Sequence, residues 1–143
     1  MGVTAFVHGE YNSTNDIGGF GVVLLGIDRD GIKHIKYISQ AARSTTSNRM
    51  ELVSVCSALD ALKIPASITI FIDSDYVING WKDMKSGTGI PTDNQDLWEK
   101  LQHAAKPHEL KISLIPASIA HISNYKAIEL SESAIADMIE EGK

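Results

Sequence analysis

Residues 66–73, ASITIFID, are the segment that most constrains the fold of this chain. The run is mostly apolar and too short for a helix, so it predicts a buried strand. It follows residues 49–63, where apolar side chains recur at the i, i+3, i+4, i+7 spacing of an amphipathic helix. A strand that is reached through a helical crossover lies parallel to an earlier strand. We expect that earlier strand to be the apolar, β-branched residues 3–8.

The rest of the chain completes one α/β domain over residues 1–143. Strand patterns at 18–28 and 31–40, joined by the turn signal Asp30-Gly31, predict an antiparallel meander with the first strand. Ser47 or Asn48 is the expected cap of the first helix. The remaining segments are helices at about 74–82 and 93–105, a strand at 110–114, and a final helix at 123–141 with Ser123 as its cap. The predicted fold class is therefore α/β, a mixed five-stranded sheet in the order β-β-β-α-β-α-α-β-α, flanked by helices.

Composition narrows the classes of partner. No apolar run approaches the roughly 18 residues that cross a bilayer, and no charged-then-apolar leader precedes the first strand, so we expect a cytoplasmic protein without a membrane partner. The single cysteine, Cys56, falls on the apolar side of the first helix and is expected in the core. Basic residues number 13 against 18 acidic ones, so a phosphate-binding surface must be local.

Three polar side chains are expected to converge at one edge of the sheet. His8 ends the first predicted strand, Asp73 ends the fourth, and Glu51 lies in the first turn of the helix after the meander. In open α/β sheets, ligands bind at the carboxyl ends of strands near a switch in strand order. Carboxylates from distant segments that meet at such an edge are typical of a Mg²⁺ site. Alone, Glu51 could merely favour the positive end of its helix, and Asp73 could merely cap the next one.

The chain resembles the type I ribonuclease H enzymes of the ribonuclease H-like superfamily over nearly its whole length. TTSNRMEL, residues 45–52, resembles the family's T-x-N-R-x-E-L block, and IDSDYV, residues 72–77, resembles its T-D-S-x-Y-V block. DNQDLWEKL, residues 93–101, is similar to the N-x-D-L-W stretch that opens a later helix. The resemblance implies that Glu51 and Asp73 are the second and third catalytic carboxylates. It also implies cleavage of the RNA strand of RNA–DNA hybrids by two-metal hydrolysis.

The chain departs from the family pattern at other site positions. The tripeptide His8-Gly9-Glu10 stands where the family has D-G-S, and Ser118 stands where it has a loop histidine. Ile128 takes the place of the fourth carboxylate in the N-x-x-x-D-x-L-A block of the last helix. A neutral imidazole offers one lone pair and cannot bridge two ions, and isoleucine offers none. Affinity for a Mg²⁺ pair is therefore expected to fall.

These departures leave three functional hypotheses. The first is a degenerate member that has lost most Mg²⁺-dependent cleavage and keeps weak binding of RNA–DNA hybrids or other nucleic acid. The second is an active nuclease with a rearranged site of His8, Glu51, Asp73 and Glu10 that uses Mg²⁺ or Mn²⁺. The third is a structural or protein-interaction module, which the acidic balance favours. The sequence leaves the oligomeric state open.

The nucleic-acid contacts are expected on two parts of the chain. Trp81 offers a stacking surface beside Lys82 and Lys85, although Trp81 could instead pack against the sheet. The family blocks add Asn48, Arg49 and Ser74 as substrate-binding candidates, and Arg43 is a further cation that could reach a phosphate.

Overall fold

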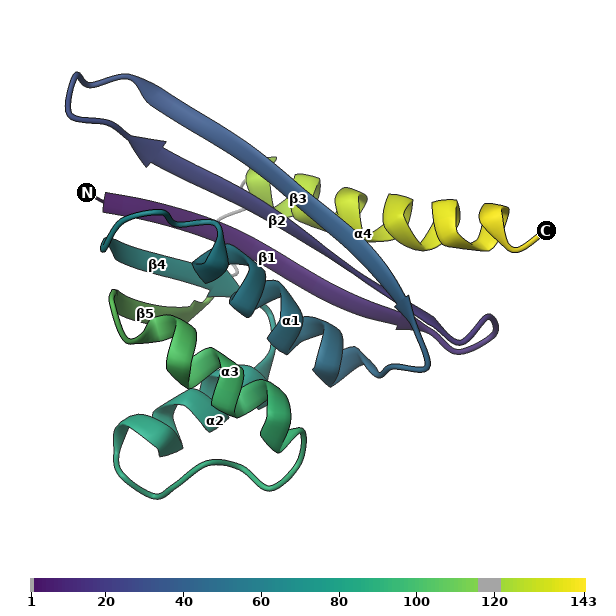
Figure 1. Cartoon of the computed structure of the whole chain (residues 1–143). Coiled ribbons are helices and arrows are strands. Elements are labelled where there is room, and N and C mark those ends of the chain that lie inside the picture. Colours follow the sequence, from purple (N-terminus) through teal and green to yellow (C-terminus); the bar gives the residue numbers. More distant parts are fainter. Residues whose placement is uncertain (1, 116–121) are drawn as a thin grey trace.

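The computed structural model describes residues 2–115 and 122–143 of the chain, which form five strands and four helices (Figure 1). The elements run in the order β1 (Gly2–Asn12), β2 (Ile17–Ile27), β3 (Lys33–Arg43), α1 (Ser47–Asp60), β4 (Ser67–Ile72), α2 (Asp75–Lys85), α3 (Gln95–Ala105), β5 (Glu109–Leu114) and α4 (Ile122–Glu141). This is the predicted order of elements.

The strands form one mixed sheet in the order β3-β2-β1-β4-β5. β1, β2 and β3 pair antiparallel, whereas β1 pairs with β4 and β4 pairs with β5 in parallel. The parallel pairing of β1 and β4 confirms the helical crossover that residues 66–73 predicted. Figure 1 shows α4 alone on one face of the sheet, with α1, α2 and α3 on the other side.

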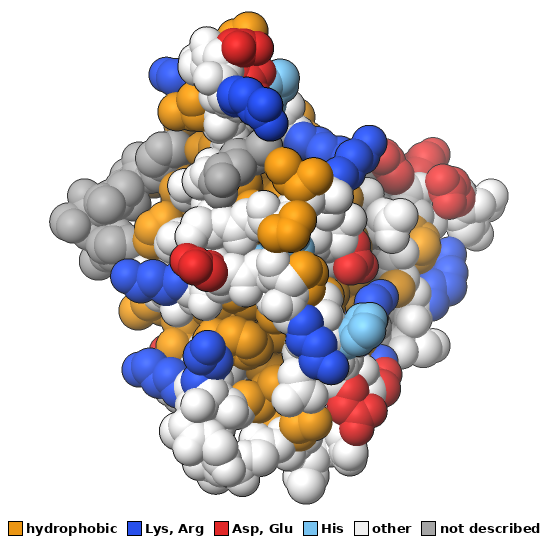
Figure 2. Space-filling view, turned by 60° about the vertical axis from the view of Figure 1, so that its left-hand side comes forward, with side chains coloured by type: hydrophobic (Ala, Val, Ile, Leu, Met, Phe, Trp, Pro, Cys, Tyr) orange, Lys and Arg blue, Asp and Glu red, His pale blue; other side chains and the backbone are white. Residues whose placement is uncertain are grey.

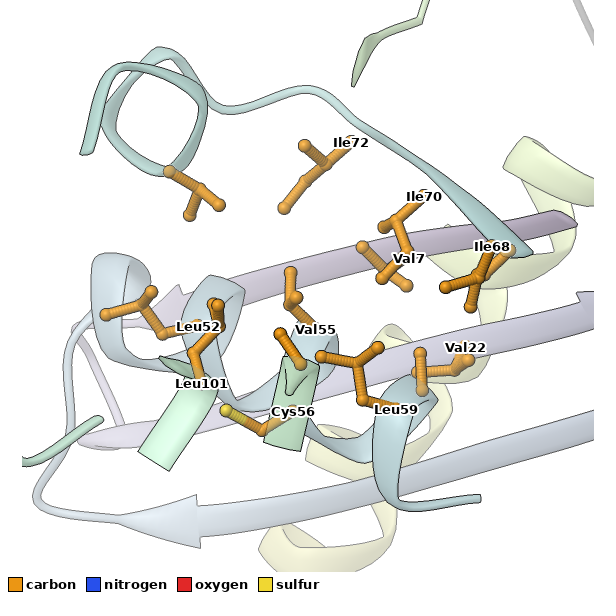
Figure 3. Packing of buried hydrophobic residues seen from close by; sticks show 14 of the residues in the cluster. Val7, Val22, Leu52, Val55, Cys56, Leu59, Ile68, Ile70, Ile72 and Leu101 are labelled. Atoms are coloured by element: carbon orange, nitrogen blue, oxygen red, sulfur yellow. The ribbon is translucent and has the colours of Figure 1, made fainter. Parts of the chain in front are cut away.

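The main core lies between the sheet and α1. Alternate residues of the inner strands point towards α1 and meet the apolar side of that helix, including Cys56, which is buried as expected (Figure 3). Trp98 of α3 closes the core and is fully buried. A smaller cluster of Phe6, Val23 and Ala127 joins the opposite face to α4. Both faces of β1 are therefore covered, one by α1 and the other by α4.

Two glycines of β2 allow α4 to approach the sheet closely. A β-carbon at Gly19 would lie 2.6 Å from the carbonyl oxygen of Ser131, and one at Gly21 would lie 2.1 Å from that of Ala127. Any side chain at these positions would push the helix away. The contact fixes the height of α4 above β1 and β2.

Three predicted element ends were wrong. β1 continues to Asn12, so His8 lies inside the strand; the pairing of His8 with Gly21 on β2 sustains it. Thr46, rather than Ser47 or Asn48, caps α1, because its side chain accepts a hydrogen bond from the Arg49 backbone N–H at 3.1 Å. Ser123 is buried within α4 rather than preceding it.

Within the described parts of the chain, no helix has the length and apolar character needed to cross a membrane.

Candidate active site

The candidate site lies where β4 leaves the sheet and β1 continues. The parallel register of these strands ends at Phe6 opposite Phe71, whose rings stack with centroids 5.2 Å apart. Two residues further along each strand, the same register brings His8 to the level of Asp73, which follows the last residue of β4. Asp73 follows the end of its strand, as predicted. His8 lies at the same level because of the strand register, although β1 does not end there.

Glu10 joins His8 on the side of β1 that faces α4. Side chains two residues apart on a strand point to the same face. His8 Nε2 lies 3.5 Å from Glu10 Oε1, and the two side chains are about one quarter and one third exposed. The hydroxyl of Ser131, from α4, donates a hydrogen bond to the same carboxylate oxygen of Glu10. Glu10 is therefore part of β1, and its carboxylate is held by contacts with His8 and with α4.

Glu51 is the most deeply buried carboxylate among the described residues and is only 6% exposed. Burial raises its pKa to about 8, a hydrogen bond from the Gly9 backbone opposes the rise, and the negative charges of Asp73 and Glu10 add to it. Its Oε2 atom is buried and has no hydrogen-bond partner within the described structure. A buried carboxylate oxygen without a partner is costly unless a ligand or proton satisfies it.

The negative charges of Asp73 and Glu10 both raise the pKa of Glu51, so these two carboxylates lie near enough to Glu51 to interact with it electrostatically. In residues 2–115 and 122–143, no three His, Cys, Asp or Glu side chains lie close enough to form a ready metal-binding group. Mg²⁺ commonly takes one or two protein carboxylates and completes its shell with water and substrate phosphates. The oxygen donors and the unsatisfied Oε2 of Glu51 fit such an ion.

The two substituted positions on the later part of the chain have different outcomes. Ile128 is half-buried on α4, and its carbonyl oxygen lies 2.7 Å from the hydroxyl of Ser131, the residue that contacts Glu10. Its side chain offers no ligand. Ser118 lies outside the described residues.

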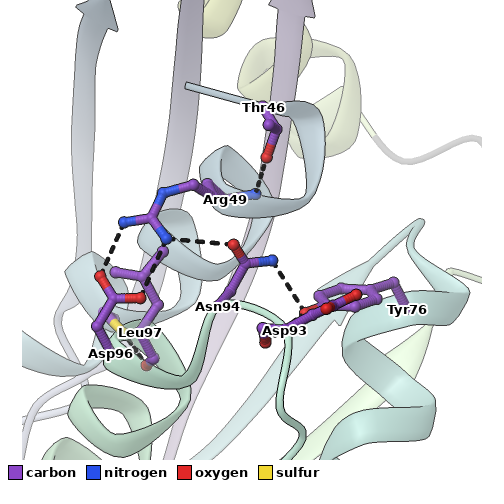
Figure 4. Close-up of polar contacts among 8 residues, drawn as sticks. Thr46, Arg49, Tyr76, Asp93, Asn94, Asp96 and Leu97 are labelled. Carbon is purple, nitrogen blue, oxygen red and sulfur yellow. Dashed lines mark hydrogen bonds and ion pairs between the residues drawn. The ribbon is translucent and has the colours of Figure 1, made fainter. Parts of the chain in front are cut away.

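The Arg49 side chain is held by hydrogen bonds to other residues of this chain (Figure 4). Its guanidinium makes hydrogen bonds of 3.0 and 2.8 Å to the two carboxylate oxygens of Asp96, and one of 3.2 Å to Asn94. Asn94 in turn donates to the hydroxyl of Tyr76 at 3.0 Å. This network, which sequence reasoning missed, ties the start of α1 to α2 and α3. In the sequence, only Asn94 and Asp96 of the DNQDLWEKL stretch indicated these contacts.

The other predicted substrate contacts differ in their exposure and in the groups that they contact. Asn48 is exposed, whereas the Ser74 side chain caps α2 by accepting a hydrogen bond from the Val77 backbone at 3.2 Å. Trp81 is half-buried and packs against the main core, with the Lys85 ammonium 5.8 Å from its ring centre. Trp81 therefore packs against the protein, which was the alternative to its role as a stacking surface for nucleic acid.

The exposed cations do not form one continuous surface on the face that Figure 2 shows. Lys and Arg side chains occupy several separate places there, with apolar and acidic side chains between them. Lys82 is exposed, and the Arg43 guanidinium lies 3.5 Å from the Met138 carbonyl of α4. A surface of this kind offers few phosphate contacts.

Comparisons with known proteins agree with this geometry. The sequence model of the RNase H family matches residues 1–136. The chain is 33% identical over 145 residues to a protein named Ribonuclease H from Lachnoclostridium phytofermentans, covering 94% of this chain and 92% of that protein. Among solved structures, LC9-RNase H1, described as a type 1 RNase H with the type 2 active-site motif, superposes with a TM-score of 0.78 at 20% identity, covering 95% of this chain and 72% of that one. LC11-RNase H1, solved in complex with an RNA/DNA hybrid, gives a TM-score of 0.71 at 18% identity over 96% of this chain and 99% of that one.

Proposed function

This chain belongs to the ribonuclease H family, and we propose that it is a divalent-metal-dependent nuclease that cleaves the RNA strand of RNA–DNA hybrids with a rearranged carboxylate set. The observation that carries the proposal is the buried Glu51, whose Oε2 is unsatisfied and whose pKa is raised by burial and by the neighbouring charges of Asp73 and Glu10. Such a charge cluster is unfavourable by itself and becomes favourable beside a cation.

In this proposal, Glu51 and Asp73 would hold the divalent ion, and Glu10 would approach it as a third ligand once the ion offsets the repulsion among the carboxylates. Once bound, such an ion supplies an activated water and stabilises the leaving oxygen during phosphodiester hydrolysis. The Gly9 backbone hydrogen bond fixes the Glu51 carboxyl. His8, 3.5 Å from Glu10, limits the directions in which Glu10 can turn. His8 would also offer its imidazole to the ion, and an imidazole nitrogen is a better ligand for a transition-metal ion such as Mn²⁺ than for Mg²⁺, so we expect the stronger activity with Mn²⁺.

The proposed substrate is the hybrid duplex, as in the complex of LC11-RNase H1. Double-stranded RNA-like duplexes are recognised through shape and backbone rather than through base edges. The scattered exposed cations support weak binding that depends on salt. Lys82 and Lys85, on one helix beside Trp81, are the cations best placed to act together.

A second candidate function is hybrid binding without appreciable cleavage. It is favoured by His8 and Ile128, which stand at two positions where the family has carboxylates. Removing two negative ligands weakens the attraction for a pair of Mg²⁺ ions.

Cleavage of an end-labelled RNA–DNA hybrid, assayed in Mg²⁺ and in Mn²⁺, tests the proposal. We expect Mn²⁺-dependent products from the parent protein and none from Glu51→Gln. Glu129→Gln is the matched control, because Glu129 is an exposed carboxylate on α4 that pairs with Lys126 at 3.1 Å; it should cleave like the parent. Hybrid binding without cleavage in either metal would favour the second candidate. Loss of both binding and cleavage would contradict both.

A further inference from the structure

Ser131 makes a contact that its place on α4 does not require. Its side chain is fully buried, and its hydroxyl reaches the Glu10 carboxylate on β1, 121 residues away in the sequence. Gly19 explains why this contact is so well placed. Gly19 is the cross-strand partner of Glu10, and its missing β-carbon lets the Ser131 backbone lie directly on the sheet. The backbones on both sides of the contact are therefore held by close packing.

The hydroxyl of Ser131 has one proton and two acceptors within reach. One is Oε1 of Glu10, and the other is the carbonyl of Ile128 at 2.7 Å, one turn earlier on the same helix. A hydroxyl can donate only one hydrogen bond. A bond to a carboxylate is roughly twice as strong as one between neutral groups. An ionised Glu10 therefore takes the proton in preference to the helix carbonyl.

His8 and Ser131 both approach the same oxygen of Glu10. The contact with His8 Nε2 at 3.5 Å is also made by Oε1. The other oxygen, Oε2, has no protein hydrogen bond within the described structure and is the atom left to bind a ligand. Residues that hydrogen-bond to a metal-binding carboxylate hold it in the geometry that the ion needs, and their loss typically lowers metal affinity by about 10- to 100-fold.

We propose that Ser131 is a positioning residue that holds the Glu10 carboxylate beside His8, so that Glu10 replaces the missing β1 carboxylate as a ligand for the divalent ion. This inference rests on the proposed function. Glu10 and Ser131 both stand where the family blocks have other residues: Glu10 takes the serine of D-G-S, and Ser131 takes the alanine of D-x-L-A. These two departures touch each other in the fold.

The first test uses the metal-free full chain and does not depend on activity. In Ser131→Ala, the side-chain carboxyl ¹³C resonance of Glu10 should shift, while that of Asp73 should stay in place. Ser131→Cys keeps most of the side-chain volume with a much weaker donor, so it should shift the Glu10 resonance as Ser131→Ala does. Ser133→Ala is the control, because Ser133 is an exposed serine two residues further along the same helix. An unmoved Glu10 resonance in both Ser131 variants would overturn the inference.

The second test measures Mn²⁺ binding by calorimetry. We expect Ser131→Ala to weaken binding by roughly tenfold, the lower end of the range for groups that orient a metal ligand. Glu10→Gln should weaken binding at least as much, and adding Ser131→Ala to it should have no further effect. Ser133→Ala should bind like the parent. An equal loss from Ser131→Ala in the parent and in the Glu10→Gln background would overturn the inference, because Ser131 would then act without Glu10.

The two proposals fail in different ways. A parent protein that binds Mn²⁺ and responds to Ser131→Ala, yet cleaves no hybrid, supports the positioning role and contradicts the nuclease proposal. A parent protein that cleaves the hybrid, with Mn²⁺ affinity indifferent to Ser131→Ala, supports the nuclease and overturns the positioning role.

Discussion

Gly9 of β1 lies directly against Glu51 of α1: a β-carbon on Gly9 would be 2.4 Å from the Glu51 backbone nitrogen, and the Gly9 backbone hydrogen-bonds the Glu51 carboxyl. The strand and the start of the helix therefore bury this carboxyl between them. A residue with a side chain at position 9 would separate the two elements and expose Glu51 to water. The altered pKa of Glu51 is thus a direct result of how closely β1 and α1 pack.

The stability of the metal-free protein should fall as pH rises. The folded-state pKa of Glu51 is about 8 against an unfolded value of 4.5, so the folded state binds the proton more tightly. The stabilisation is complete below pH 4.5 and is lost as pH rises towards 8, at up to about 1.4 kcal/mol per pH unit. Glu51→Gln, which cannot ionise, should remove this slope and be more stable than the parent at pH 8. Chemical denaturation from pH 5 to 8.5 measures both.

Glu129→Gln is the control for that experiment, because Glu129 is exposed and makes a surface ion pair. Its slope should match that of the parent. A parent slope that survives Glu51→Gln would assign the pH dependence to another group.

Gly21→Ala should strongly destabilise the fold. The new β-carbon would lie 2.1 Å from the Ala127 carbonyl oxygen, and backbone cannot move aside as a flexible side chain can. We expect a loss at the upper end of the roughly 1–3 kcal/mol that overpacking costs. Gly26→Ala, in the same strand, meets nothing closer than 3.9 Å and should be neutral or slightly stabilising. Equal effects in thermal melts would contradict the close packing of α4.

His8→Asp should raise Mg²⁺-dependent cleavage more than Ile128→Asp does, because residue 8 lies at the level of Asp73 and beside Glu10. We expect an increase of about tenfold or more, equal to about 1.4 kcal/mol of transition-state stabilisation. Without metal, the new carboxylate lies beside Glu10, whose Oε1 is 3.5 Å from the present imidazole, so the variant should melt below the parent. Mg²⁺ should reverse that loss, since a ligand of the native state stabilises it.

The double variant His8→Asp/Ile128→Asp should recover the most Mg²⁺-dependent cleavage, because it restores both missing carboxylates. A double variant that cleaves the hybrid in neither Mg²⁺ nor Mn²⁺ would show that residue 128 no longer faces the bound ion and that the site has been remodelled.

Arg49→Ala should cost about 1 kcal/mol of stability, because a bidentate pair is stronger than an ordinary surface ion pair. Lys143→Ala, which breaks a pair with Glu140 in which both side chains are at least 70% exposed, should cost almost nothing. Urea denaturation at low and high salt compares the two. Equal effects would mean that the contacts of Arg49 with Asp96 and Asn94 contribute no stability.

Hybrid binding should depend on salt with a shallow slope. If Lys82, Lys85 and Arg43 supply the phosphate contacts, the slope of log K against log salt should be about −3. Fluorescence anisotropy with a labelled hybrid measures it. Lys82→Ala should reduce the slope by about 1, while Lys143→Ala, distant from α2 in the sequence and at the end of the chain, should leave it unchanged. Binding that is insensitive to salt would exclude a phosphate-based contact.

Local sequence patterns were enough to predict the order of the elements, the parallel placement of β4 and a position of Glu51 close enough to Asp73 for the two charges to interact. Each of these predictions follows from hydrophobic periodicity over a few residues or from the end of a strand. Such patterns depend only on residues that are close together in the sequence. The place of Glu51 beside a carboxylate of another strand was predictable because a helical crossover restricts where the next strand can go.

Only the tertiary structure decided how far β1 extends and what Glu10 does. β1 continues past His8 because β2 supplies hydrogen-bond partners as far as Asn12, and no pattern within residues 3–8 records that pairing. The Glu10 carboxylate is held in place because Ser131, 121 residues later in the sequence, reaches it from α4, and Gly19 and Gly21 allow that helix to lie against the sheet. Local pattern reports which face of an element is apolar, whereas contacts between polar groups across that face depend on how closely the elements pack.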